Sequence, residues 1–365
     1  MSIVYGSLLA LLVPLLFLGI IHKSDFYQTG QFHIIRRCLF WGGITFAPAT
    51  FIYSFLENFW LKNPETVIHF AAPAYEELLK GLILLYLVRR AKFTYSVDGA
   101  LYGFAIGTGF AVVENFYYIF FFDISGATEI ALQRIFSANL VHAFSSATLG
   151  ITLGMFRSRT SRQRWYLPVL GLIFAIGQHM LFNILIGRKE ISSTLFYIPI
   201  IPGILFMYYI MQRGKKQAQI WIKEKLGMDS YVTRSEVVLV DRLTDPEDAL
   251  YPIVERFGAE KAGQVEKLLY LQARLGIKRK ALDGFRDNDA IHKDVEAETK
   301  DMYKDMKKIQ REIGAYVMLF VRGLFTEEML SVWDRMQVKI QKQSAATGGQ
   351  KGGGVWSSLE ERVKS

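Results

Sequence analysis

The sequence contains a single cysteine, Cys38, among its 365 residues. One cysteine excludes an intrachain disulfide and any cysteine-rich metal site. The chain also has no lysine or arginine before His22 and no small-x-small cleavage motif there, so the first apolar segment lacks the features of a signal peptide. We therefore expect that segment to remain in the protein as a membrane span.

The net charge of +9 comes without a basic stripe that is interleaved with aromatic residues. The absence of such a stripe argues against nucleic acid as a partner. Lysine and arginine in cytoplasmic loops account for an excess of positive charge in a membrane protein. No internal repeat of about 20–50 residues is present, which excludes a solenoid.

Apolar residues make up 51% of the chain, and they occur in long blocks that stop near Met211. A helix needs about 20 residues to cross about 30 Å of hydrocarbon. The blocks predict an all-α fold, a polytopic membrane helix bundle of about seven transmembrane helices. The predicted spans are residues 2–21, 38–56, 66–88, 99–122, 131–156, 165–187 and 191–211.

Basic residues are concentrated after the first, third, fifth and seventh of these spans. They are Lys23, Arg36 and Arg37, then Arg89, Arg90 and Lys92, then Arg157, Arg159, Arg162 and Arg164, and finally Arg213, Lys215 and Lys216. Cytoplasmic loops carry the excess of positive charge. We therefore expect an outside N-terminus and a cytoplasmic C-terminal region in a cell membrane.

The composition changes after the last span, which suggests three parts. Residues 1–213 form the predicted transmembrane domain. Residues 214–343 are charged and helix-patterned, with a basic juxtamembrane helix at 215–226, and predict a helical cytoplasmic domain that could bind a cytosolic partner. Residues 344–365 are glycine-rich and predict a flexible tail. The C-terminal region shows no catalytic motif.

Strongly polar side chains interrupt four consecutive spans. They are Glu76, Glu77 and Lys80 in the third, Glu114 and Asn115 in the fourth, His142 in the fifth, and His179 and Asn183 in the sixth. A charged group at membrane depth is costly unless it is paired or hydrated, so such groups commonly mark a functional site. At about 1.5 Å per residue, the acidic and histidine groups fall about 12–16 Å below the outer surface. We expect them to meet in one hydrated cavity.

Helix geometry refines this expectation. Lys80 follows Glu76 by four residues and Glu77 by three, so it can pair with either. The two adjacent glutamates diverge by about 100°, so one is expected to face the cavity while the other orients a neighbour. Pro73 should loosen the third helix one turn earlier. Gly99, Gly103 and Gly107 in the fourth span form a stripe for close helix packing.

The chemistry of this set suits peptide-bond hydrolysis. A carboxylate can take a proton from water and return it to the leaving amine, while the histidines and Asn183 can donate hydrogen bonds to an oxyanion. Glu77, Glu114, His142 and His179 could also hold a zinc ion. The sequence does not separate a water-activating glutamate from a metal site. Two other readings stay open: a non-catalytic scaffold or receptor that uses the same polar cluster for packing, and a proton- or ion-coupled transporter.

Four ordered motifs resemble the PrsW family of membrane proteases. They are Glu-Glu-x-x-Lys at residues 76–80, Phe-x-x-x-Glu-Asn at 110–115, His142, and His-x-x-x-Asn at 179–183. The family is grouped with the type II CAAX prenyl endopeptidases as glutamate-dependent intramembrane proteases. The resemblance covers residues 66–187, and Asp98-Gly99 also fits it. Residues 215–365 have no counterpart in the family core.

The resemblance implies a bacterial membrane endopeptidase in which Glu76 and Glu77 are the catalytic pair. Glu114, His142 and His179 would complete the site. The implied substrate is a membrane-anchored anti-sigma factor, cut on its extracytoplasmic side. The superfamily also includes the non-proteolytic scaffold subunit of γ-secretase, so the scaffold reading is retained beside the protease.

Overall fold

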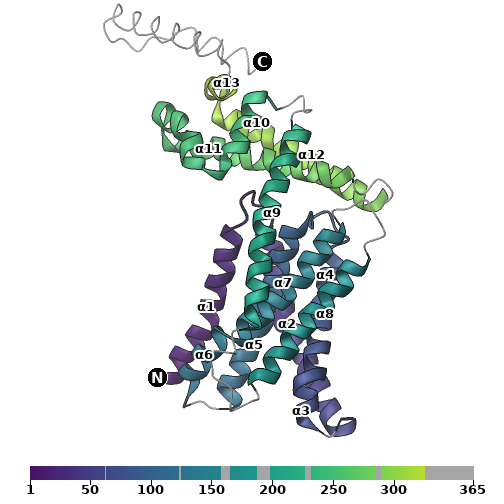
Figure 1. Cartoon of the computed structure of the whole chain (residues 1–365). Coiled ribbons are helices and arrows are strands. Elements are labelled where there is room, and N and C mark those ends of the chain that lie inside the picture. Colours follow the sequence, from purple (N-terminus) through teal and green to yellow (C-terminus); the bar gives the residue numbers. More distant parts are fainter. Residues whose placement is uncertain are drawn as a thin grey trace, which may run out of the picture. The chain divides into compact units, whose positions relative to one another are not determined.

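The computed structural model describes residues 1–61, 63–122, 125–157, 165–186, 198–226, 232–283 and 289–324. Every regular element in these ranges is a helix, which confirms the predicted all-α class (Figure 1). The chain divides into two compact units. Unit 1 comprises Met1–Ala218 and Ile277–Glu298, and unit 2 comprises Gln219–Gly276 and Thr299–Ser365.

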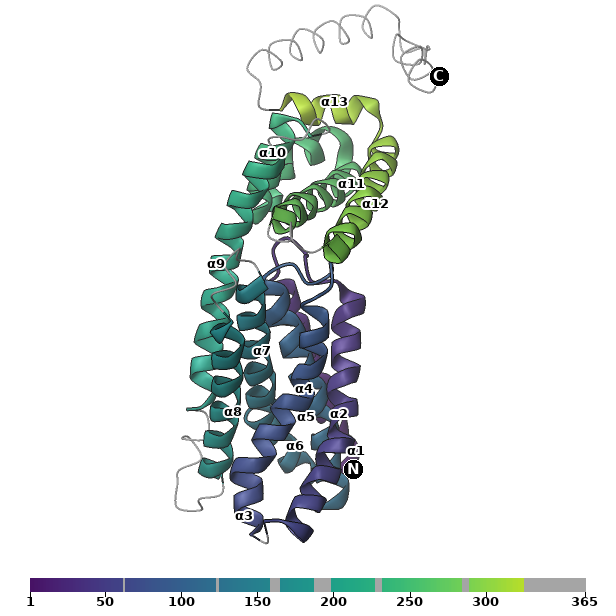
Figure 2. The ribbon, with the colours of Figure 1, turned by 90° about the vertical axis from the view of Figure 1, so that its right-hand side faces the viewer.

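Unit 1 is a bundle of long helices with two short elements at one end. Its elements are α1 (Ser2–Lys23), α2 (Phe32–Phe59), α3 (Pro64–Thr66), the π-helical turn η1 (Val67–Ala71), α4 (Ala72–Leu87), α5 (Ser96–Phe121), α6 (Ala127–Ile135), α7 (Ala138–Arg157), α8 (Tyr166–Ile186) and the first part of α9 (Ile200–Leu226). The end of α11 (Pro246–Asp283) and the start of α12 (Asp289–Ile313) also belong to unit 1. Helices α2, α4, α5, α7 and α8 run along one another (Figure 2).

Four helices of the described residues are long and apolar enough to cross a membrane. They are α1, α2, α5 and α8. This finding supports a polytopic membrane protein, while the expected number of about seven spans stays a prediction. α4 has 16 residues and α7 has 20, and both carry several polar side chains. A helix that lies inside a bundle does not need an apolar surface all round, because its neighbours satisfy its polar groups.

Two of the predicted spans differ from the helices that form. The single span predicted for residues 131–156 is instead two helices, α6 and α7, which are interrupted at Phe136 and Ser137. The last span, predicted as residues 191–211, contains α9 from Ile200 onward, while residues 191–197 lie outside the described ranges. α9 continues to Leu226, so the basic segment at 215–226 extends this helix.

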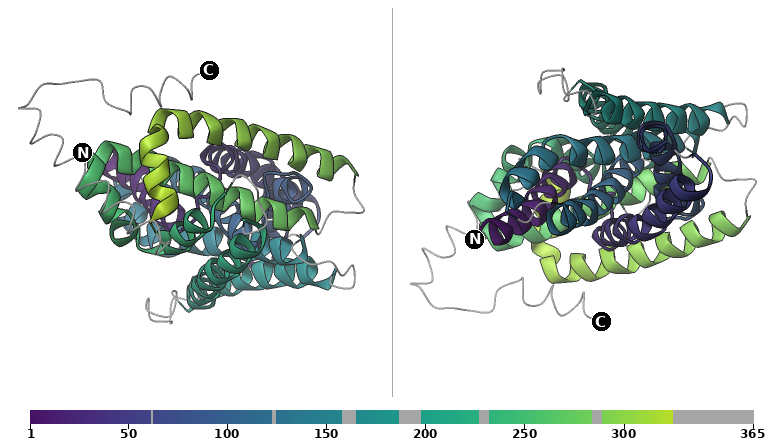
Figure 3. Two further views of the ribbon diagram at one scale, coloured as in Figure 1. Left: turned by 90° about the horizontal axis from the view of Figure 1, so that it is seen from above. Right: turned by 90° about the horizontal axis from the view of Figure 1, so that it is seen from below.

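The centre of unit 1 is the contact between α5 and α7. Beta carbons built on Gly99, Gly103 and Gly107 would meet backbone carbonyl groups of α7, those of Gly150, Ser146 and His142. The predicted glycine stripe is thereby confirmed, since only glycine lets two helix backbones approach this closely. Residues 96–111 of α5 are all buried, and Figure 3 shows the helices from their two ends.

Unit 2 is also helical. It contains the end of α9, α10 (Arg234–Asp241), the 3₁₀ turn η4 (Arg242–Thr244), most of α11 (Pro246–Asp283), the end of α12 (Asp289–Ile313) and α13 (Ala315–Gly323). Thr233 and Glu236 form a reciprocal capping box at the start of α10. Buried Glu236 also accepts a hydrogen bond from Gln272 Nε2 at 3.1 Å. The predicted glycine-rich tail lies outside the described residues.

A buried carboxyl group lies in the segment between α1 and α2. Asp25 is 4% exposed, and its Oδ2 accepts hydrogen bonds from the Gly30 amide at 2.7 Å and the Thr29 hydroxyl at 3.2 Å. Burial, and then the negative charge of Asp98, raise the pKa of Asp25 from 3.8 to about 7. Between these two values the folded chain keeps a proton that the unfolded chain has lost. Stability is therefore expected to fall as pH rises from about 4 to about 7.

Asp25→Asn should remove this dependence, because an amide accepts the same hydrogen bonds but does not ionise. The melting temperature of the variant minus that of the wild type should be higher at pH 8 than at pH 5, by an amount on the order of 5 °C. Thermal unfolding of the detergent-solubilised protein at both pH values measures it. Glu65→Gln changes an exposed carboxyl group and is the control. An equal difference at both pH values would contradict the prediction.

Candidate active site

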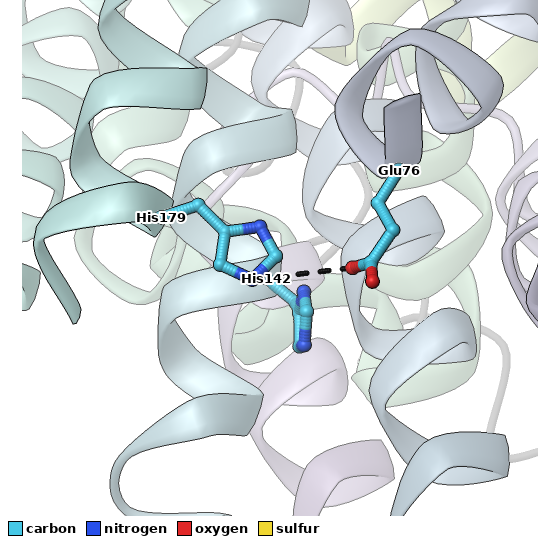
Figure 4. A group of neighbouring side chains, drawn as sticks. All are labelled: Glu76, His142 and His179. Atoms are coloured by element: carbon cyan, nitrogen blue, oxygen red, sulfur yellow. Dashed lines mark ion pairs between the residues drawn. The ribbon is translucent and has the colours of Figure 1, made fainter. Parts of the chain in front are cut away.

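Three side chains from three helices of unit 1 point toward one another. Glu76 comes from α4, His142 from α7 and His179 from α8 (Figure 4). One potential ligand atom from each lies within 4.8 Å of the others. The two imidazole rings meet edge to face with their centroids 4.6 Å apart. Spans three, five and six therefore do converge on one place, as the sequence predicts.

Glu77 lies beside this group and is fully buried. Its Oε1 lies 2.5 Å from Lys80 Nζ and 3.1 Å from His179 Nδ1. The hydroxyl of Ser145 donates to the same oxygen at 3.0 Å, and that of Ser146 donates to Oε2 at 3.3 Å. Every contact holds a carboxylate in place, so the surroundings of Glu77 suit a charged group that orients its neighbours.

Glu76 has very different surroundings, as its adjacency to Glu77 predicts. Its Oε2 has no hydrogen-bond partner among the described residues and lies 3.9 Å from His179 Nε2. The Glu76 side chain is 14% exposed, whereas that of Glu77 is 0% exposed. Glu76 is therefore the glutamate of the pair that has an oxygen available for water or an ion.

The partners of each histidine determine which ring nitrogen carries a proton. A carboxylate can only accept and an ammonium can only donate. His179 Nδ1 faces Glu77 and so donates, which leaves Nε2 as an acceptor directed at Glu76. His142 Nε2 lies 2.8 Å from Glu114 Oε2 and donates, while Nδ1 accepts from Lys80 Nζ at 3.0 Å. Each imidazole thus has one accepting nitrogen, Nε2 in His179 and Nδ1 in His142.

Glu114 belongs to the same network but lies behind His142. Its Oε2 also forms an ion pair with Arg134 of α6 at 2.6 Å. Asn115 lies next to it on α5, and its Oδ1 accepts a hydrogen bond from Arg134 Nε at 2.8 Å. The predicted residues Glu114 and Asn115 are therefore close to the cluster, and both are engaged by an arginine.

Sequence reasoning missed three residues of this network. Arg134 belongs to none of the four motifs, and no local pattern connects it to Glu114, twenty positions earlier. Ser145 and Ser146 also lie outside the motifs, yet both donate to Glu77. Their spacing of three and four residues from His142 on α7 was the signal that could have placed them on the same face.

Asn183 connects α8 to η1, the turn that precedes α4. Its Nδ2 donates to the carbonyl oxygen of Ile68 at 2.9 Å. In the π-helical turn, the amide of Ala72 bonds the carbonyl of Val67, five residues earlier. The next bond in this series would join Pro73 to Ile68, but proline has no N–H, so the carbonyl of Ile68 is left for Asn183. Its role as an oxyanion donor remains a prediction.

Asn183→Ala should lower the free energy of unfolding by about 0.5–1.5 kcal/mol, because the Ile68 carbonyl loses its donor. Adding Pro73→Ala restores a backbone N–H at the position that can reach this carbonyl. The double variant should therefore unfold at a higher temperature than Asn183→Ala alone. Identical unfolding temperatures for the single and double variants would show that Asn183 does not serve this carbonyl.

The donor set fits a divalent metal ion. Two neutral imidazoles and one carboxylate are ligands that zinc and related ions accept. Each histidine donates its other N–H to a carboxylate, Glu77 or Glu114, as in many metal sites. The converging group contains Glu76, whereas the sequence suggested Glu77 and Glu114 as ligands. Lys80 Nζ contacts His142 Nδ1, so an ion bound at that nitrogen would replace the ammonium contact.

The comparisons agree with this arrangement. Residues 31–211 match the model of the PrsW family intramembrane metalloproteases. Protease PrsW of Bacillus subtilis strain 168 is 26% identical over 204 residues, which are 55% of this chain and 90% of that protein. Protease PrsW of Shouchella clausii is 26% identical over 174 residues, which are 47% of this chain and 79% of that protein. No solved structure matches the chain.

The matched residues contain all the polar side chains described above. The match begins at residue 31 and ends at residue 211, so it includes α4, α5, α6, α7 and α8. α1 and all of unit 2 lie outside it. Through residues 31–211, the chain belongs to the PrsW family of membrane proteases.

Proposed function

We propose that this protein is an endopeptidase that hydrolyses a peptide bond of a membrane-anchored protein close to the extracytoplasmic side of a bacterial cell membrane. The observation that carries the proposal is the convergence of Glu76, His142 and His179 within 4.8 Å. The substrate class, an anti-sigma-factor-like membrane protein, follows from the family. In the proposed topology the N-terminus lies outside and the C-terminal region is cytoplasmic.

Glu76 is the proposed proton acceptor. It has an oxygen without a hydrogen-bond partner among the described residues, and it faces the histidines. A carboxylate in this position takes a proton from the attacking water and passes it to the leaving amine. No covalent intermediate with the protein is needed, and the hydroxyls of Ser145 and Ser146 are occupied by Glu77.

A metal ion is the proposed cofactor, and zinc is the candidate. His142, His179 and one carboxylate oxygen of Glu76 would hold it, and the second oxygen of Glu76 would remain to accept the proton. When bound, such an ion polarises the scissile carbonyl group and makes water more acidic. Glu77, with the serines and Lys80, fixes the ring of His179, and Glu114 fixes the ring of His142. These contacts fix the orientation of both rings and direct them at the same point.

The accessible side of the cluster supports an approach of substrate past Glu76 and Glu114. The side chains of Glu76, Glu114 and Arg134 are 14%, 17% and 14% exposed, whereas those of Glu77 and Lys80 are fully buried. The hydrated cavity that the proposal requires would therefore open on the side of α5 and α6. Lys80 and Glu77 would form its closed end.

The purified protein in proteoliposomes tests the proposal with a single-pass membrane reporter that carries an anti-sigma-factor segment. We expect one cut, mapped by mass spectrometry to the extracytoplasmic half of the reporter. A chelator should stop cleavage and zinc should restore it. A scaffold or receptor would leave the reporter intact under all conditions. Cleavage that resists complete metal removal, verified by elemental analysis, would refute the metal assignment and leave the protease assignment standing.

A further inference from the structure

Arg134 is held in one position by three contacts with α5. Its guanidinium forms the ion pair with Glu114 Oε2 at 2.6 Å and donates through Nε to Asn115 Oδ1 at 2.8 Å. Its Cζ also lies 3.9 Å from the centre of the Tyr118 ring. A planar guanidinium that is bonded at its edge and stacked on its face has little freedom to turn. The side chain is therefore part of a fixed arrangement.

The helix that carries Arg134 is anchored from its other side by α1. Thr128 exchanges hydrogen bonds with Ser2, at 3.0 Å to its carbonyl oxygen and 3.1 Å between the hydroxyls. Three alanine and isoleucine side chains of α6 are fully buried with Ala10 of α1 and Ile119 of α5. α1 and α5 together thus set where α6, and with it Arg134, can lie.

The ion pair acts on His142 through a shared oxygen. Glu114 Oε2 contacts both the guanidinium of Arg134 and Nε2 of His142. The planar guanidinium of Arg134 therefore orients the carboxylate of Glu114 toward His142. In this orientation Oε2 accepts the N–H of His142 at Nε2, which leaves Nδ1 as the accepting nitrogen of the ring. Without the guanidinium, Glu114 would be a partly buried carboxylate that lacks its permanent cation.

We infer that Arg134 is a positioning residue of the active site, which acts through Glu114 to hold His142 ready to bind the metal ion. This inference rests on the proposed function, since it takes His142 as a ligand. Arg134 does not touch the substrate or the reacting atoms. Its loss changes the affinity for the ion and the turnover number, and leaves the binding of substrate unchanged.

Arg134→Gln is the first test. The zinc affinity of the purified protein, measured by competition with a chromophoric chelator, should fall by about 10–100-fold, as is typical when the partner of a metal-binding histidine is disturbed. The turnover number should fall while KM stays within about 2-fold of the wild type, because ground-state binding is untouched. Arg134→Lys keeps the charge but not the planar fork, so it should recover part of the zinc affinity.

A double-variant cycle with Glu114→Gln shows whether Arg134 acts through Glu114. If it does, adding Arg134→Gln to Glu114→Gln should lower zinc affinity by less than about 2-fold, because the intermediary is already removed. Fully additive losses would overturn the inference. Glu129→Gln removes an exposed charge from the same helix and should leave zinc affinity unchanged.

The outcomes separate this inference from the proposed function. If the wild type cleaves the reporter and Arg134→Gln binds zinc as tightly as the wild type, the role of Arg134 is refuted and the protease assignment stands. If the double-variant cycle gives the expected zinc affinities but the wild type cleaves no reporter, the protease assignment is refuted and the role of Arg134 stands. If Arg134→Gln folds poorly, Tyr118→Leu is the second variant. It removes the ring that Arg134 stacks on and keeps the ion pair with Glu114. Its zinc affinity should then fall, but by less than that expected for Arg134→Gln.

Discussion

Glu76→Gln is expected to lower peptide cleavage by about 10²–10⁴-fold, the usual contribution of a general base, and to leave the melting temperature unchanged. Glutamine has nearly the same shape as glutamate but cannot accept a proton from water. The Oε2 of Glu76 has no hydrogen-bond partner among the described residues, so the substitution breaks no contact at that oxygen. Function should therefore be lost without a loss of stability.

The measurement is the cleavage rate of the membrane reporter beside the unfolding temperature of the same preparation. Glu65→Gln is the matched control, because Glu65 is an exposed glutamate eleven residues before Glu76. The control should cleave at the wild-type rate. Normal cleavage by Glu76→Gln would show that Glu76 is not the general base.

Glu77→Gln should also abolish cleavage, but through the loss of contacts that hold the site together. Glutamine would leave the fully buried ammonium of Lys80 without its counter-ion and would not hold His179 as a carboxylate does. Breaking a buried ion pair costs about 3–5 kcal/mol. Glu77→Gln should thus lose both cleavage and thermal stability. A stable, inactive Glu77→Gln protein would show that Glu77 takes part in the chemistry itself.

Gly107→Ala is expected to destabilise unit 1 and to disturb the site together. A methyl group at residue 107 would meet the carbonyl group of His142, which belongs to the backbone of α7 and cannot turn away. Overpacking of this kind costs about 1–3 kcal/mol, and more where only backbone can move. Because the displaced residue is His142, cleavage and zinc affinity should fall along with the unfolding temperature.

Gly177→Ala is the matched control for this substitution. Gly177 also lies inside a transmembrane helix, α8, but a methyl group there would find nothing within 4 Å. Alanine favours a helix over glycine by about 1 kcal/mol, so this variant should be as stable as the wild type or more so. Equal stability of the Gly107 and Gly177 variants would contradict the close packing of α5 on α7.

Much of the site could be predicted because the membrane makes polar residues conspicuous. Glu76, Glu77, His142 and His179 stand out in apolar surroundings, and helix geometry predicts that the two glutamates diverge. Arg134 could not be found this way. Its contact with Glu114 depends on how α6 packs against α5, and nothing in the order of the residues encodes that packing.

The break between α6 and α7 was missed for a related reason. Residues 131–156 form one block by hydropathy, yet the chain turns at Phe136 and Ser137 and only then begins α7. Hydropathy measures the preference of a segment for lipid. The same apolar segment has the same hydropathy whether it forms one straight helix or two helices, so hydropathy does not reveal the break. The direction of α6 depends on its contacts with Ile119 of α5 and with Ala10 of α1, more than 100 residues earlier in the chain.

The order of the residues by itself determined that this chain is helical, that it carries apolar spans, and which acidic and histidine groups lie inside them. These properties are local, since they follow from hydropathy and from the spacing of motifs. Only the tertiary structure decided that Glu76 has an oxygen without a hydrogen-bond partner among the described residues, while Glu77 is fully buried among its partners. It also decided that Arg134 contacts the carboxylate that binds His142. Those assignments depend on which neighbour each side chain meets, and a helix sequence specifies its own faces but not the surfaces packed against them.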